Sequence, residues 1–106
     1  MSKDYEARLI KYLRDFREVA RKVKDRVRCF DPEAKVYVFG SVARGNFTAA
    51  SDIDILIVTG AVEKKYVMMV EVYKDTEAPV ELHVTTPEKF EGWYRRFIDP
   101  EEIIEI

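Results

Sequence analysis

The sequence predicts a small α/β (α+β) domain in which helices pack on a mixed β-sheet. Residues 4–28 and 86–98 place apolar side chains at the three- and four-residue spacing of an amphipathic helix. Short runs rich in β-branched residues, at 36–39, 53–59 and 80–85, have the length and composition of strands. Because each element has one apolar face to bury, helices layered on a sheet are the simplest arrangement.

The chain of 106 residues is expected to form a single domain, residues 1–106. Its 47% hydrophobic and 36% charged content is typical of a water-soluble globular protein. No apolar run approaches the roughly 20 residues that span a bilayer, and no signal peptide is visible. The lone Cys29 excludes an internal disulfide, and we expect it to be a buried or half-buried packing residue. These features together predict a cytoplasmic protein.

The first helix is predicted to run from about residue 4 to residue 28, and Asp31-Pro32 ends it. Its apolar stripe consists of Leu9, Leu13, Phe16, Ala20, Val23 and Val27. Residues 1–29 hold ten Lys and Arg against five Asp and Glu, although the whole chain has a net charge of −2. This basic segment could bind nucleic acid or an acidic partner. The acidic residues interleaved in it favour the simpler alternative, a solvated helix face with ion pairs.

Residues 63–75 fit two patterns. Four apolar residues recur there at helical spacing, namely Tyr66, Met69, Val70 and Tyr73. The continuous run at 67–73 also suits a buried strand, so the residues alone leave both alternatives open. After Pro100 we expect a last short strand or tail, built on Ile103, Ile104 and Ile106.

The strand predicted at 80–85 places Glu81 and His83 on the same face, because side chains alternate along a strand. Thr86 is expected to cap the helix that follows, with Pro87 at its first position. Four aromatic residues of that helix are expected to be buried: Phe90, Trp93, Tyr94 and Phe97.

The segment from Gly40 to Val58 carries the clearest functional pattern. A Gly-Ser turn ends the first strand, and Asp52 and Asp54 open the second. One face of the second strand is predicted to carry Ile53, Ile55 and Ile57, and the other Asp52, Asp54 and Leu56. Residues two apart on a strand have Cα atoms about 6.5–7 Å apart, so both carboxylates can lean toward the same divalent cations.

Each half of this pattern also has a simpler explanation. An Asp at the start of a strand is commonly a turn or cap residue, and a Gly-Ser pair is commonly only a turn. Both occur together here, each next to a strand-like run. Backbone N–H groups of a small turn can hold a phosphate, and paired carboxylates are ligands that Mg²⁺ prefers. The combination therefore predicts chemistry on a nucleotide.

The same segment resembles the minimal nucleotidyltransferase family, the smallest members of the DNA polymerase β-like superfamily. The family signature is Gly-Ser, ten residues, then Asp-x-Asp, and Gly40, Ser41, Asp52 and Asp54 match it without a gap. The Ala-Arg-Gly extension that often follows Gly-Ser matches at residues 43–45. The resemblance implies the nucleotidyltransferase fold and a crossover helix over residues 63–75. It also implies a third carboxylate on a later strand, where this chain has Glu81 in place of the more frequent Asp.

The resemblance implies transfer of a nucleoside monophosphate from a nucleoside triphosphate, most often AMP from ATP, with release of pyrophosphate. Asp52, Asp54 and Glu81 are then expected to be catalytic and to hold two Mg²⁺ ions, with Mn²⁺ as a possible substitute. Gly40, Ser41 and Arg44 are expected to bind the phosphates; a surface ion pair is the simpler role for Arg44. For His83 we favour a structural or supporting role over substrate contact.

The acceptor is less defined. Minimal family members resemble antitoxins that attach AMP to a tyrosine of an all-helical HEPN-type toxin, so such a partner is the specific hypothesis. A chain this small has no room for further domains that grip base and acceptor, which favours a partner protein or a homo-oligomer. Two alternatives remain open: an acceptor that is RNA or a small molecule, and a non-catalytic module that only binds its partner.

Overall fold

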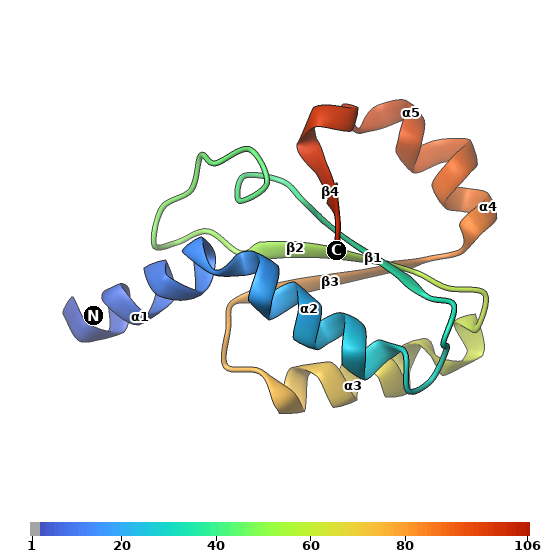
Figure 1. Cartoon of the computed structure of the whole chain (residues 1–106), viewed down its shortest axis with the longest axis horizontal. Helices are drawn as coiled ribbons and strands as arrows, with labels where there is room; N and C mark the ends of the chain where they lie inside the picture. The colour runs from blue at the N-terminus through green and yellow to red at the C-terminus, as the bar shows by residue number, and fades with distance from the viewer. Residues whose placement is uncertain (1–2) are drawn as a thin grey trace.

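The computed structural model describes residues 3–106 and contains a four-stranded sheet in the order β3-β2-β1-β4 (Figure 1). The strands are β1 (Lys35–Phe39), β2 (Ile53–Val58), β3 (Val80–Thr85) and β4 (Ile103–Glu105). β2 runs parallel to β3, whereas β1 is antiparallel to both β2 and β4. The predicted mixed sheet is therefore confirmed, and the predicted strands match within one or two residues.

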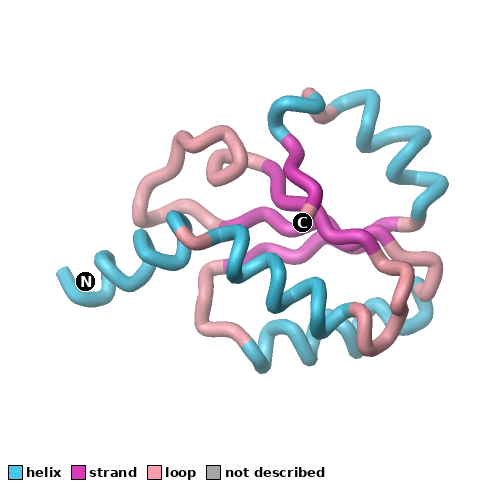
Figure 2. Tube along the Cα trace, viewed as in Figure 1, coloured by secondary structure: helices cyan, strands magenta, loops and turns pink. Residues whose placement is uncertain are grey.

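One face of the sheet is covered by helices. α2 (Phe16–Val27) packs against β1 and against α3 (Lys65–Asp75), and Figure 2 shows both helices on the same side of the strands. Among the buried side chains of this layer are Val19, Val23 and Val27 of α2, Met68 and Val72 of α3, and Ile53, Ile55 and Ile57 of β2. The predicted isoleucine face is therefore the core face. Residues 63–75 are helical, preceded by a 3₁₀ turn, and α3 connects the parallel strands β2 and β3.

The single helix predicted over residues 4–28 is wrong. The chain forms α1 (Lys3–Arg14) and α2, which are separated at Asp15 with φ −92° and ψ 28°. A straight helix of 25 residues would be about 37 Å long, whereas strands of five or six residues span only about 17–20 Å. Only α2, the second half of the predicted helix, packs on the sheet. Leu13 is the one residue of α1 that is buried. In Figure 1, α1 extends beyond the sheet.

The other face of the sheet is covered only in part, by the segment between β3 and β4. This segment consists of α4 (Pro87–Lys89), a π-helical turn (Phe90–Tyr94) and α5 (Arg95–Phe97). The predicted cap is confirmed, because the Thr86 hydroxyl accepts a hydrogen bond from the Lys89 N–H at 3.2 Å. Figure 1 shows α4 and α5 on the side of the sheet opposite α2 and α3.

The predicted burial of four aromatic residues here is mostly wrong. Phe90 is buried and its ring stacks on Tyr37 at 4.7 Å, and Tyr94 is half-buried. Trp93 and Phe97 are 56% and 70% exposed. The N–H of Arg95 bonds to the Phe90 carbonyl five residues back, so the turn contains one residue more than an α-helical turn. That extra residue rotates the following side chains away from the face that Phe90 occupies.

Two further predictions concern the surface. Cys29 is exposed in the turn after α2, so the prediction of a packing role is wrong; α2 ends at Val27 and the chain turns outward before Cys29. Within residues 3–106, no helix combines the length and the apolar character that crossing a bilayer requires.

Candidate active site

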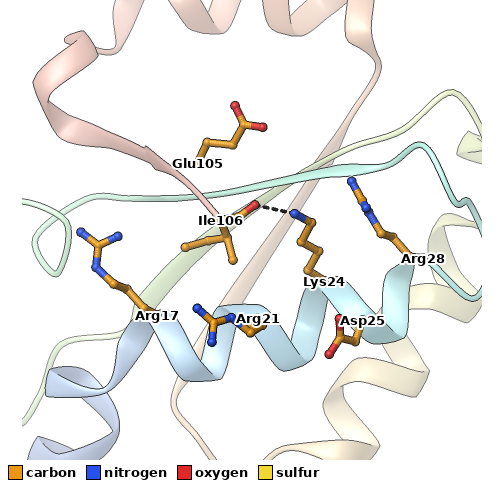
Figure 3. A pocket seen from close by; sticks show the side chains of 7 residues that line it. All are labelled: Arg17, Arg21, Lys24, Asp25, Arg28, Glu105 and Ile106. Atoms are coloured by element: carbon orange, nitrogen blue, oxygen red, sulfur yellow. Dashed lines mark hydrogen bonds between the residues drawn. The ribbon is translucent and has the colours of Figure 1, made fainter.

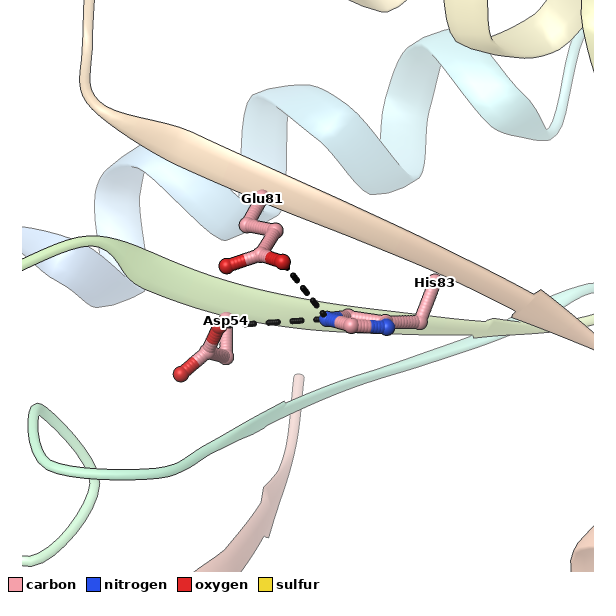
Figure 4. Close-up of side chains that lie close together, drawn as sticks. All are labelled: Asp54, Glu81 and His83. Carbon is pink, nitrogen blue, oxygen red and sulfur yellow. Dashed lines mark ion pairs between the residues drawn. The ribbon is translucent and has the colours of Figure 1, made fainter.

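The uncovered part of the sheet's second face carries a group of polar side chains. In the strand register Asp54 lies between Phe39 of β1 and Glu81 of β3, and His83 lies two pairs further along, opposite Leu56. Because these residues occupy equivalent positions of the pleat, their side chains point to the same side. Figure 4 shows Asp54, Glu81 and His83 converging from β2 and β3.

The three side chains form a compact donor group. One ligand atom from each of Asp54, Glu81 and His83 lies within 4.8 Å of the other two. The His83 Nε2 atom is 3.8 Å from Asp54 Oδ1 and 3.9 Å from Glu81 Oε1, which is too far for direct hydrogen bonds. The His83 ring leans on the Phe39 ring with centroids 5.3 Å apart, so its orientation is fixed by packing. At this spacing Nε2 makes no hydrogen bond to either carboxylate, and the three side chains can surround a shared ion.

The electrostatics of the group also favour a cation. Burial raises the pKa of Asp54, and the nearby negative charge of Glu81 raises this pKa further, while His83 acts in the opposite direction. The Asp54 side chain is 25% exposed, so water screens this repulsion incompletely. A divalent cation bound by the carboxylates would remove the penalty of ionising both. The donor set of two carboxylates and an imidazole therefore fits a metal ion.

Gly40 connects this group to the turn after β1. Its φ is +80°, and a Cβ atom built on it would collide with the Asp54 carboxylate oxygen Oδ2. Only glycine allows this backbone to lie so close to Asp54 without strain. The Gly-Ser pair is thus positioned directly against the carboxylate, as a phosphate-binding turn beside a metal would have to be.

Residues 41–45 form a turn after Gly40. Its first hydrogen bond runs from the Arg44 N–H to the Gly40 carbonyl at 3.1 Å, and the Asn46 N–H donates to the Ser41 carbonyl at 2.9 Å. The N–H groups of residues 41–43 precede the first bond of the turn, like the leading donors of any helix. Ser41 is half-buried at the start of this turn.

Asp52 lies outside the donor group. It is exposed and precedes β2, whose pairing with the β3 region begins at the Ile53 N–H, bonded to the Pro79 carbonyl at 2.7 Å. Its charge is the smallest of the influences that raise the pKa of Asp54. Asp52 lines an open hollow of about 530 Å³ together with Tyr5 and Leu9 of α1. Alternation predicted Asp52 on the same face as Asp54, but β2 begins only at Ile53, so strand pairing does not fix the direction of this side chain.

Arg44 also lies outside the donor group. Its guanidinium is 3.9 Å from the Glu102 carboxylate, in an ion pair whose partners are both more than two-fifths exposed. The surface ion pair considered for Arg44 is therefore present. It links the turn after β1 to the segment that leads into β4.

The supporting role predicted for His83 stays a prediction, and its Nε2 lies among the atoms that could hold a metal ion. The parallel register of β2 and β3 is what brings His83 to the group. It pairs Asp54 with Glu81, and His83 is the next residue of β3 on the same face. A single sequence predicts the strands but not that register.

A second charged region lies apart from this group. Four basic residues of α2 and its C-cap line a hollow of about 400 Å³ beside the last residues of the chain: Arg17, Arg21, Lys24 and, at the cap, Arg28 (Figure 3). The Lys24 ammonium donates to the Ile106 carbonyl at 2.7 Å. α2 covers the face of the sheet opposite Asp54, so the basic charge of the first segment does not line the donor group.

Comparison with known proteins identifies the family. The model of the nucleotidyltransferase domain matches residues 17–106. The chain belongs to this family. A crystal structure of a candidate nucleotidyltransferase aligns with a TM-score of 0.58 and 25% identity, covering 81% of this chain and 95% of that one. Another, from Sulfolobus solfataricus, aligns with a TM-score of 0.56 and 29% identity, covering 86% of this chain and 81% of that one.

No curated protein sequence matches the chain. The resemblance to minimal nucleotidyltransferases is nevertheless confirmed by the family match and by these two structures. Membership of a nucleotidyltransferase family implies a nucleoside triphosphate as substrate and transferase activity. Divalent metals are general in such enzymes, and the Asp54, Glu81 and His83 group is the place in this nucleotidyltransferase where the described residues fit one.

Proposed function

We propose that this nucleotidyltransferase transfers AMP from ATP to an acceptor hydroxyl at the Asp54–Glu81 group. The observation that carries the proposal is the pairing of Asp54 with Glu81 on neighbouring parallel strands, with the Gly40 turn lying against Asp54. This arrangement combines a place for a divalent cation with a place for phosphate oxygens. The family match supports nucleotidyl transfer as the reaction class.

Asp54 and Glu81 would hold the metal, and we propose Mg²⁺, two ions in the active complex, with Mn²⁺ as a substitute. Asp52 is proposed as a third carboxylate ligand, because it is exposed and its charge already acts on Asp54. When bound, such ions neutralise triphosphate charge and make an acceptor hydroxyl easier to deprotonate. His83 is proposed to position the two carboxylates, since its ring is fixed on Phe39 between them.

The chain's own residues would then bind and orient the substrates. The N–H groups that follow Gly40, together with the Ser41 hydroxyl, are proposed to hold β- and γ-phosphate oxygens. Arg44 is proposed to turn from Glu102 to the phosphates, because an exposed ion pair of this kind contributes little to stability. Glu81, the most exposed of the group, is proposed to accept the proton of the acceptor hydroxyl.

The acceptor that we propose is a tyrosine of a HEPN-type partner, which would make this chain an antitoxin. Only the resemblance of the motif to minimal family members supports this choice. The test is to incubate the chain with ATP, Mg²⁺ and a HEPN protein encoded beside it, and to measure intact masses. We expect the partner to gain whole AMP units, and an unchanged partner mass would reject it as the acceptor.

Asp54→Asn and Glu81→Gln should each reduce transfer at least about 10³-fold, because metal ions contribute several kcal/mol to such transition states. Glu88→Gln, an exposed carboxylate on α4, is the matched control and should retain full activity. Activity that persists in Asp54→Asn would reject the site.

Two further experiments test the alternative functions. Transfer from labelled ATP to RNA or to small hydroxylated molecules would identify another acceptor. Neutralisation of the partner that survives Asp54→Asn would indicate a module that only binds.

A further inference from the structure

The outer face of α3 exposes apolar side chains. Of the eight large hydrophobic residues that are exposed among residues 3–106, five lie in this helix and the turn before it. They are Val62, Tyr66, Val67, Val70 and Tyr73, and Tyr66 is 76% exposed. The opposite face of α3 is also apolar, because Met68 and Val72 are buried against the sheet. A helix with apolar side chains on two opposite faces is normally covered on both of them.

The exposed residues form one stripe. Val62, Tyr66, Val70 and Tyr73 are separated by four, four and three residues, which places them along one side of the helix. Tyr73 is held rigidly, since its hydroxyl accepts a hydrogen bond from the Leu82 N–H at 3.2 Å, at the free edge of β3. Fixed aromatic side chains in an apolar stripe are typical of protein–protein interfaces.

The charges beside the stripe indicate what covers it. Glu63, in the 3₁₀ turn that precedes α3, and Lys74, in the last turn of α3, carry opposite charges near the two ends of the stripe, roughly 17 Å apart along the axis. In an antiparallel pair of α3 helices, Glu63 of each copy faces Lys74 of the other. A parallel pair would place like charges together. The Lys74 ammonium is only loosely engaged in its own chain, 3.8 Å from Glu71 with 67% of its side chain exposed.

We propose that the outer face of α3 is a two-fold interface with a second copy of this chain. The apolar stripes pack antiparallel at the centre, and two reciprocal Glu63–Lys74 contacts fix the direction. α3 lies on the face of the sheet opposite Asp54, so the dimer leaves both donor groups open. The inference rests on the fold and not on the proposed chemistry.

Sedimentation equilibrium of the full chain tests the proposal. We expect a dimer at concentrations well below roughly 100 µM, and Tyr66→Ser and Val70→Lys should each weaken it at least about tenfold. Phe97→Ser, which removes an equally exposed apolar side chain from the other layer, is the matched control and should leave the dimer intact. Thermal melts confirm that each variant is folded.

A charge exchange tests the antiparallel arrangement. Glu63→Lys alone and Lys74→Glu alone should each weaken the dimer, and the double exchange should restore it. A wild-type chain that stays monomeric above roughly 100 µM overturns the proposal. A dimer that neither Tyr66→Ser nor Val70→Lys weakens would also overturn it. The same holds if the double exchange of Glu63 and Lys74 does not restore the dimer. A monomer that binds a different protein through Tyr66 and Val70 assigns the face to that partner and also overturns it.

Discussion

The two faces of the sheet differ although the same strands build them. On one face Ile53, Ile55 and Ile57 are fully buried under α2 and α3. On the other, the same strand β2 presents Asp54, which stays partly open to water beside Glu81. Neighbouring residues of one strand therefore differ in their surroundings: the isoleucines hold the sheet to its helices, and Asp54, the proposed metal ligand, faces the open side.

The second face is itself divided. At one end Phe90 closes over Tyr37, Leu56 and Val58 in a small apolar cluster. At the other end nothing comparable covers Asp54 among the described residues, and the side chains there are polar. The closed end anchors the segment from α4 to α5, and the open end leaves access to the donor group. Burial stabilises the end of this face under Phe90, whereas the lack of cover at the other end leaves Asp54 accessible to solvent.

The largest expected effect comes from the closed face. Ile55→Ala removes a fully buried side chain and leaves a cavity, and such changes destabilise proteins by about 2–5 kcal/mol. Glu81→Gln, on the open face of the next strand, should change stability by no more than about 0.5 kcal/mol. Urea unfolding of both variants measures the difference. Equal losses of stability would mean that the two faces do not divide the tasks in this way.

Substitutions at two glycines distinguish the stability cost of backbone strain from an effect on metal binding at the site. Gly40 and Gly45 both have positive φ, so replacing either by Ala costs roughly 1–2 kcal/mol of backbone strain. Only at Gly40 does the added Cβ meet Asp54, because nothing lies within 4 Å of a Cβ at Gly45. We expect Gly40→Ala to weaken Mg²⁺ binding by roughly 10–100-fold, as changes beside metal ligands do. Gly45→Ala should leave it unchanged.

Calorimetric titration with Mg²⁺ or Mn²⁺ measures these affinities, and thermal melts measure the strain. Equal metal binding by the two variants would show that the close approach of Gly40 to Asp54 does not serve the site. Equal loss of stability with unequal metal binding is the expected result.

The sequence predicted what depends on local pattern. Alternation identified the isoleucine face, and the motif spacing pointed to Asp54 and Glu81 through the family resemblance. The isoleucine face is confirmed because a strand fixes the direction of each side chain once its start is known, whereas the roles of Asp54 and Glu81 stay predictions. The cap at Thr86 and the stop after Val27 are also local, since a few neighbouring residues form them.

The errors arise where distant parts of the chain decide. Asp15 breaks the first helix because the sheet below it is short, and no property of Asp15 itself indicates this. Trp93 and Phe97 turn outward because one extra residue enters the turn at Phe90. The neighbours of His83, which the sequence did not identify, likewise come from the register of β2 and β3. Each depends on lengths and registers that helical or strand periodicity does not contain.

The smallest expected effect is the pH dependence of stability at Asp54. Burial and Glu81 raise the pKa of Asp54 in the folded protein above its ordinary value near ~3.9. The folded state therefore binds more protons than the unfolded state between these two pKa values. Stability falls as pH rises through this window, and the full penalty is present above it. Asp54→Asn removes the penalty because the amide does not ionise.

Urea unfolding from pH 3 to pH 8 without divalent metal, compared between wild type and Asp54→Asn, isolates this contribution from the other carboxyl groups. The two proteins should differ little at the acid end, and the variant should become the more stable one as pH rises. Asp52→Asn, whose carboxylate raises the pKa of Asp54 less than Glu81 does, should show a smaller gain. Saturating Mg²⁺ should stabilise wild type more than Asp54→Asn, because a cation on the open face offsets the repulsion that the variant no longer has. A variant that is less stable than wild type at neutral pH without metal would mean that the open face, like the closed one, is built for stability.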